Sequence, residues 1–181
     1  MKKMTNYTER VFKGAVTVFL ISIVGMFIAY LFRIFLARNL SVEDFGLFYA
    51  IIAFTGLLAL FRDLGLNSAL IKYIPEFLVK KEFEKIKYSI ISVTFIQLII
   101  IFILILPFFV FSDQIAVSYF HTISASMPLK ILLIAFITSI FIPLFQAMLQ
   151  GLSKMKMYSI IEPLRMSIIY VFTYFFIHLG V

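Results

Sequence analysis

The sequence predicts an all-α protein, a polytopic bundle of about five transmembrane helices. Of the 181 residues, 63% are hydrophobic and only 14% are charged, and the mean hydropathy is +1.09. A soluble domain is about half apolar and about a quarter charged. Apolar runs of about 18 residues or more recur along the chain, and a helix of that length crosses the hydrocarbon core of a bilayer.

We expect one transmembrane domain over residues 1–181, with spans at roughly 14–36, 45–74, 86–111, 127–151 and 157–180. The first run is far longer than the apolar core of a signal peptide and has no evident small-residue cleavage site, so we expect a retained helix. Ser22, Gly25 and Ala29 lie on one side of it, and such small residues let another helix approach closely.

The second span begins with a predicted capping box, in which the side chains of Ser41 and Asp44 meet the free amides of the helix. A helix over 45–74 would measure about 45 Å, longer than a hydrocarbon core of about 30 Å. It must therefore tilt, kink or break. Gly65 and Asn67 are the expected weak points, and Pro75 is expected to end the helix or to force a break.

A lysine-rich connector over 80–87 leads into the third span. Within the fourth span, Pro143 is expected to kink the helix or to free a carbonyl group for another partner. The fifth span carries Glu162 and Arg165, three residues apart and therefore on one face.

The basic residues are distributed unevenly between the two ends of the spans. The N-terminal segment, the connector and Lys154 with Lys156 fall on one side, whereas the other side has chiefly Arg38 and Lys130. Basic loops stay in the cytoplasm, so we expect a multi-pass plasma-membrane protein with a cytoplasmic N-terminus. The same pattern accounts for the net charge of +7, and nucleic-acid binding is not expected.

Polar residues of three spans are expected at similar depths in the cytoplasmic half of the membrane. They are Arg62, Asp63, Gln146, Gln150, Glu162 and Arg165. A charged side chain facing lipid deep in the core costs about 2.5–3.5 kcal/mol, which a hydrated cavity would largely remove. Two alternatives stay open: these residues reach the inner interface, or Glu162 and Arg165 form a simple intrahelical pair.

Guanidinium groups bind phosphate through two parallel hydrogen bonds, so the arginines are candidate contacts for an anionic head group. We name Arg62, with help from Arg33 or Arg165. The candidates for lining the cavity or binding a coupling ion are Asp63, Gln146, Gln150 and Glu162.

Nothing in the sequence indicates catalysis. His121 and His178 are far apart, cysteine is absent from the sequence, and neither a glycine-rich phosphate loop nor a nucleophile elbow occurs. We therefore expect no enzyme, no metal site and no cofactor.

Short motifs between Arg38 and Glu76 resemble the N-terminal signature of Wzx-type polysaccharide-export flippases, a branch of the multidrug/oligosaccharidyl-lipid/polysaccharide flippase superfamily. The matching residues are Ala37–Ser41, Glu43–Gly46, Asp63–Leu66, Ile74–Glu76 and Gln150–Gly151. The resemblance implies a MATE-like helical bundle that flips a lipid-linked oligosaccharide, a polysaccharide precursor, from the inner to the outer leaflet.

Members of that family have two helical halves, and this chain corresponds to most of the first. The resemblance therefore implies a fragment or half-transporter whose partners are membrane lipids, the lipid-linked glycan and a second helical half, in the full-length protein or in another chain. Two other functions stay open. One is an ion-coupled multidrug exporter with Asp63 and Glu162 as proton or sodium sites, and the other is a non-transporting scaffold or remnant.

Overall fold

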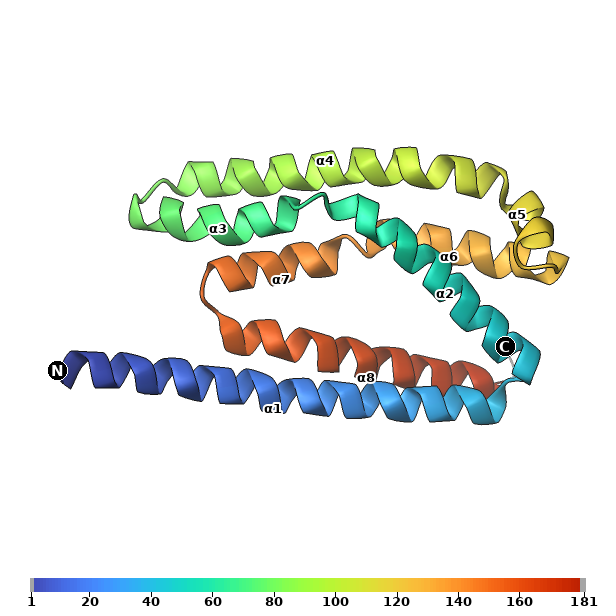
Figure 1. Ribbon diagram of the computed structural model, residues 1–181, viewed down its shortest axis with the longest axis horizontal. Coiled ribbons are helices and arrows are strands. Elements are labelled where there is room, and N and C mark those ends of the chain that lie inside the picture. Colours follow the sequence, from blue (N-terminus) through green and yellow to red (C-terminus); the bar gives the residue numbers. More distant parts are fainter. Residues whose placement is uncertain (1, 180–181) are drawn as a thin grey trace. The chain divides into compact units, whose positions relative to one another are not determined.

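The computed structural model describes the backbone of residues 2–179, with the side chains of Phe12 and of 14–179 (Figure 1). Throughout this part of the chain the regular elements are helices. Five segments are long and apolar enough to cross a membrane: Gly14–Asn39, Val42–Asp63, Phe83–Val110, Ile123–Gly151 and Met155–Leu179. The predicted all-α class with about five spans is therefore confirmed.

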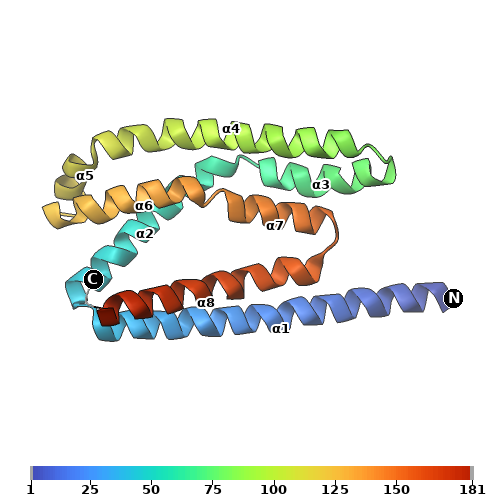
Figure 2. The same ribbon diagram turned by 180° about the vertical axis from the view of Figure 1, so that it is seen from behind.

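The chain divides into two compact units, Met1–Leu40 with Ser153–Val181, and Ser41–Leu152. The first unit consists of α1 (Lys2–Asn39) and α8 (Met155–Leu179), which run parallel and side by side (Figures 1 and 2). Gly25 is buried against Pro163, and a Cβ atom at Gly25 would lie 3.1 Å from the proline Cγ. Gly25 thus lets α8 approach closely, as its small size predicted.

The second unit contains the remaining helices. They are α2 (Val42–Asp63), α3 (Leu66–Val79), α4 (Phe83–Val110), α5 (Ser112–Ser118), a 3-10 turn (Ile123–Ala125), α6 (Ser126–Thr138) and α7 (Phe141–Gly151). The pairs α2–α6 and α3–α7 pack together, and α4 contacts α2, α3 and α6. The Oγ of Ser41 accepts a hydrogen bond from the backbone amide of Asp44 at 3.0 Å, which confirms the predicted cap of α2.

The second predicted span is two helices rather than one. α2 ends at Asp63, and Leu64 and Gly65 take left-handed conformations with φ of 44° and 81° before α3 begins. Gly65 is therefore at the break, as predicted. The prediction that Pro75 ends the helix is wrong, because α3 continues to Val79.

The continuation past Pro75 has a packing reason. Leu70 and Ile74 of α3 are 2% and 1% exposed and belong to the hydrophobic cluster shared with α7. The van der Waals packing of these side chains against α7 favours a continuous helix and opposes the cost of about 3 kcal/mol for proline inside it.

The fourth predicted span is also interrupted. α6 ends at Thr138 and α7 begins at Phe141, with Pro143 in its first turn. Proline has no N–H group, so the carbonyl of Ser139, four residues earlier, has no helical partner there. The predicted effect of Pro143 is confirmed, and it is a full break at Ser139 and Ile140.

Two separate hydrophobic clusters hold the second unit together. The larger lies among α2, α5, α6 and the C-terminal half of α4, and includes Leu58, Ile101 and Leu133. The smaller lies among α3, α7 and the N-terminal half of α4, and includes Ile74 and Val93. Both interruptions fall between these clusters, so the uninterrupted α4 is the helix that joins them.

Candidate functional site between two broken helices

The breaks of the second and fourth spans lie side by side in both views of the ribbon (Figures 1 and 2). A side-chain hydrogen bond connects them, because Nη1 of Arg62 donates to Oγ of Ser139 at 2.7 Å. The Ser139 hydroxyl in turn donates to the carbonyl of Phe136 at 2.7 Å. The Ser139 hydroxyl therefore donates its proton to a nearby carbonyl group and accepts a hydrogen bond from Arg62.

Arg62 is buried, with 9% of its surface exposed. Its guanidinium carbon lies 5.3 Å from the ring centroid of Phe136, within the range of a cation–π contact. The Nε atom is buried and has no hydrogen-bond partner among the residues that the structure describes. Because buried donors are normally paired, Arg62 retains an unmet capacity for an acceptor such as a phosphate oxygen.

The side chain of Asp63 bonds to α3 and α4, whereas that of the neighbouring Arg62 bonds to Ser139. The Oδ1 of Asp63 accepts a hydrogen bond from Nε2 of Gln97 on α4 at 3.0 Å and another from the backbone amide of Asn67 at 3.1 Å. The second bond caps α3, whose own N-cap position is a glycine without a side-chain oxygen. The carboxylate also suits the positive end of the α3 dipole.

Gln97 lies in the middle of α4, the longest apolar helix in the second unit. Together with Arg62, Asp63 and Ser139 it forms the polar group at the two breaks. It is fully buried, and its Nε2 also lies 3.3 Å from Oδ1 of Asn67. Gln97 and Ser139 were not among the site residues predicted from the sequence. The available signals were an amide inside the apolar run 86–111 and a serine four residues before Pro143.

The two predicted glutamines, Gln146 and Gln150, lie one turn apart on α7 and are half-buried. Within the described part of the chain, no hydrogen bond joins either of them to Arg62 or Asp63. The structure therefore groups Arg62 and Asp63 with Ser139 and Gln97 rather than with the α7 amides.

The other predicted residues belong to the first unit. Arg165 donates through Nε to Oε2 of Glu162 at 3.1 Å and through Nη2 to Oε1 of the same carboxylate. This intrahelical pair, one of the two alternatives from the sequence, is present in α8. Arg33 is exposed on α1. Of the residues predicted to share one layer, Arg62 and Asp63 thus lie in the second unit and Glu162 and Arg165 in the first, while Gln146 and Gln150 join neither group.

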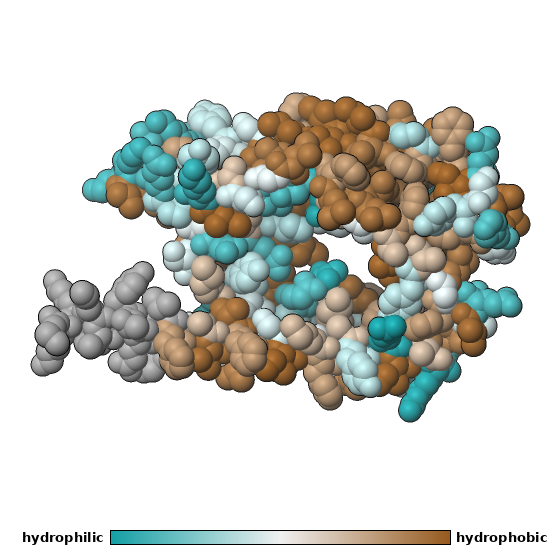
Figure 3. Space-filling view, viewed as in Figure 1, coloured by the Kyte–Doolittle hydropathy of each residue, from teal (hydrophilic) through white to brown (hydrophobic). Residues whose placement is uncertain are grey.

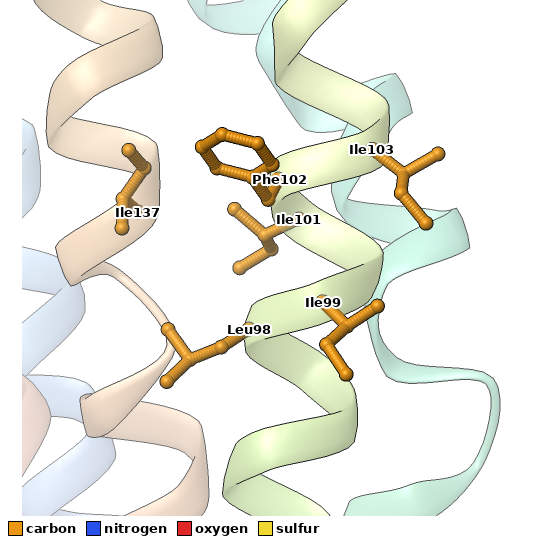
Figure 4. A pocket seen from close by; sticks show the side chains of 6 residues that line it. All are labelled: Leu98, Ile99, Ile101, Phe102, Ile103 and Ile137. Carbon is orange, nitrogen blue, oxygen red and sulfur yellow. The ribbon is translucent and has the colours of Figure 1, made fainter.

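An apolar groove of about 350 Å³ is lined by residues that lie close in sequence to the polar group (Figure 4). Phe102 and Leu98 of α4 lie opposite Ile137 of α6, while Ile103 points away from Ile137. Leu98 directly follows Gln97, and Ile137 precedes Ser139 by two residues. A wholly hydrocarbon lining suits an acyl chain or the apolar face of another helix.

Comparison with known proteins agrees with this architecture. The profile of the family described as "Polysaccharide biosynthesis protein" matches residues 11–181. An uncharacterized membrane protein of Methanocaldococcus jannaschii is 32% identical over 184 residues, which cover 96% of this chain and 36% of that protein. The chain therefore spans about a third of the length of that curated relative. No solved structure matches the chain.

Proposed function

Since the chain belongs to the polysaccharide biosynthesis protein family, we propose that it forms part of a transporter that moves a lipid-linked oligosaccharide from the inner to the outer leaflet of the plasma membrane. The family match and the five candidate spans support a membrane role in polysaccharide synthesis. The direction of movement and the flippase activity are our proposal.

One observation carries it: two interrupted spans meet at the buried Arg62. Irregular backbone at membrane depth is tolerated only where it is covered by protein or lines a water-filled cavity. Transporters place their binding sites at such interruptions near the bilayer midplane. Arg62, Asp63 and their partners supply the polar groups that such a site needs.

In this proposal the anionic pyrophosphate of the substrate binds Arg62. The bond from Arg62 to Ser139 closes the site at rest. Opening breaks this bond and separates Arg62 from Ser139, while the packing of α2 on α6 and of α3 on α7 away from the breaks stays intact. The substrate phosphate then replaces Ser139 as the acceptor for the guanidinium group.

The test is a flipping assay in proteoliposomes with a complete transporter that carries this chain and a fluorescent lipid-linked oligosaccharide. We expect Arg62→Ala and Arg62→Lys to lower the flipping rate at least about tenfold. Charge-assisted hydrogen bonds contribute about 1.5–3 kcal/mol, and about 1.4 kcal/mol corresponds to tenfold. Lysine keeps the charge but lacks the two-point geometry.

Arg38→Ala is the matched control, because Arg38 is an exposed arginine at the end of α1. Circular dichroism and gel filtration confirm that each variant is folded before flipping is measured. Flipping by a folded Arg62→Ala protein at the rate of the Arg38→Ala control would exclude Arg62 as a substrate contact.

A further inference from the structure

A second groove, of about 490 Å³, lies between α3 and α4. Its volume falls in the range typical of small-molecule sites, about 300–1,000 Å³. Its lining changes from Ala69, Leu70 and Val93, with Ser89 and Ser92 beside them, to Tyr73, Phe77, Tyr88 and Lys85. None of the residues predicted to contact the transported substrate lines this groove.

The polarity of the groove changes along its length. Val93 lies eight residues beyond Lys85 on α4, which is about 12 Å along the helix. Val93 is one turn from the buried Gln97, whereas Lys85 adjoins the connector between α3 and α4. The space-filling view shows hydrophilic residues gathered over the connector end and hydrophobic residues along α4 (Figure 3).

Two ammonium groups lie against the aromatic wall of the groove. The Nζ of Lys85 is 6.0 Å from the ring centroid of Phe77, and the Nζ of Lys72 is 5.3 Å from that of Tyr73. The two rings stack on each other with centroids 6.2 Å apart. Lys85 itself lines the groove, whereas Lys72 lies beside it through its contact with Tyr73.

The charge balance at this end favours an anion. Between residues 72 and 87 there are five lysines and three glutamates. Lys85 gives one hydrogen bond to Oε1 of Glu82 at 2.8 Å, and an ammonium group has three donors. The groove therefore combines an apolar end with a cationic end that can donate further hydrogen bonds.

We propose that this groove binds one anionic phospholipid. Its phosphate contacts Lys72 and Lys85, and the first part of an acyl chain lies along Ala69, Leu70 and Val93. A free phosphate ion would leave the apolar end of the groove empty. A phospholipid would fill both ends, with its phosphate at the cationic end and its acyl chain at the apolar end. The site goes beyond the proposed transport activity, because it holds a resident membrane lipid and not the transported glycan.

Native mass spectrometry of the detergent-solubilised full chain tests this proposal, with phosphatidylglycerol and phosphatidylcholine as the probes. We expect the first phosphatidylglycerol to bind at least about fivefold more weakly to K72Q/K85Q than to the wild type. Phosphatidylcholine binding should be the same in both proteins. Inorganic phosphate at the same concentration should not displace phosphatidylglycerol.

K154Q/K156Q is the matched control, because it removes two exposed lysines from the first unit. An equal loss of phosphatidylglycerol in this control would assign the binding to general surface charge and overturn the proposal. Displacement by inorganic phosphate would also overturn it, since the site would then recognise a free anion. Ala69→Leu keeps both lysines and obstructs the apolar end, so we expect it to weaken phosphatidylglycerol binding as well.

Discussion

Ser139 accepts a hydrogen bond from Arg62 at 2.7 Å, and this bond connects the ends of two interrupted helices. Each interruption leaves backbone groups without helical partners, and each lies at the end of an apolar helix. The bond therefore places a charged side chain at the level where the backbone is irregular. Asp63, the residue after Arg62, accepts a hydrogen bond from Gln97 on α4. The two adjacent residues Arg62 and Asp63 therefore contact two different helices, α6 and α4.

Ser139→Ala is expected to lower the free energy of unfolding by about 1–3 kcal/mol, because it leaves a further guanidinium donor buried without a partner. Unfolding in a graded detergent mixture, followed by circular dichroism, measures the change. Thr138→Ala is the control, since Thr138 is exposed and its hydroxyl bonds only within α6. Equal stability of the two variants would mean that the Arg62–Ser139 bond contributes nothing to folding.

Gln97→Leu is expected to destabilise the protein by about 1–3 kcal/mol, since the Asp63 carboxylate loses a donor inside the bundle. Gln146→Leu is the matched control, because Gln146 is half-buried and has no described hydrogen bond to the polar group. The same unfolding measurement compares them. If Gln146→Leu proved the more damaging, the polar group would be centred on α7 rather than on α4.

Gly151→Ala is expected to cost about 1–3 kcal/mol by overpacking the contact between α7 and α3. A Cβ atom at this position would lie 2.9 Å from the Cβ of Ile74, and both atoms are fixed to backbone. Gly56→Ala has open space around the new methyl group and should leave stability unchanged or raise it by up to about 1 kcal/mol. Thermal unfolding of the two variants in the same detergent checks the difference, and loss of stability in Gly56→Ala alone would refute the packing argument.

Asp113, at the start of α5, should titrate abnormally. Hydrogen bonds from Lys130, at 2.9 Å, and from Ser126 hold the pKa of its carboxyl group below the ordinary value. Because the pKa is lower in the folded state, the ion pair stabilises the fold at pH values above the range in which an ordinary aspartate titrates. That stabilisation is lost as the pH falls through the lower pKa of the folded state.

Carbon-detected NMR of the labelled Asp113 carboxyl group measures this pKa directly. In Lys130→Gln the pKa should rise toward that of a free aspartate, because the main cause of the lowered pKa, the charged donor Lys130, is lost. Lys80→Gln, which removes an exposed ion pair with Glu76 elsewhere, is the control and should leave the Asp113 titration unchanged. An unshifted Asp113 in Lys130→Gln would show that the ion pair does not form in solution.

The features predictable from sequence were those set by local chemistry. Hydropathy predicted the five spans, Gly65 and Pro143 predicted the two breaks, and the three-residue spacing allowed the pair of Glu162 and Arg165. Each depends only on residues that are close together along the chain. Proline geometry alone predicted the wrong end for α3, because the packing of Ile74 that sustains the helix involves a distant segment.

The partners of Arg62 and Asp63 were not predictable in the same way. Ser139 and Gln97 lie 77 and 34 residues away along the chain, and neither is charged. Which polar residue meets which is decided by the packing of α2 on α6 and of α2 and α3 on α4. Estimated depth in the membrane, by which the polar residues were grouped from sequence, instead placed Gln146 and Gln150 beside Arg62.

The separation of 77 residues between Arg62 and Ser139 has a consequence for biosynthesis. When α2 first leaves the ribosome and reaches the insertion machinery, the serine that will accept its arginine has not yet been translated. Arg62 lies at the end of α2, and an arginine without a partner at membrane depth costs up to about 2.5–3.5 kcal/mol. We therefore expect α2 to remain beside the insertion machinery until α6 emerges, so that the two broken spans enter the lipid together.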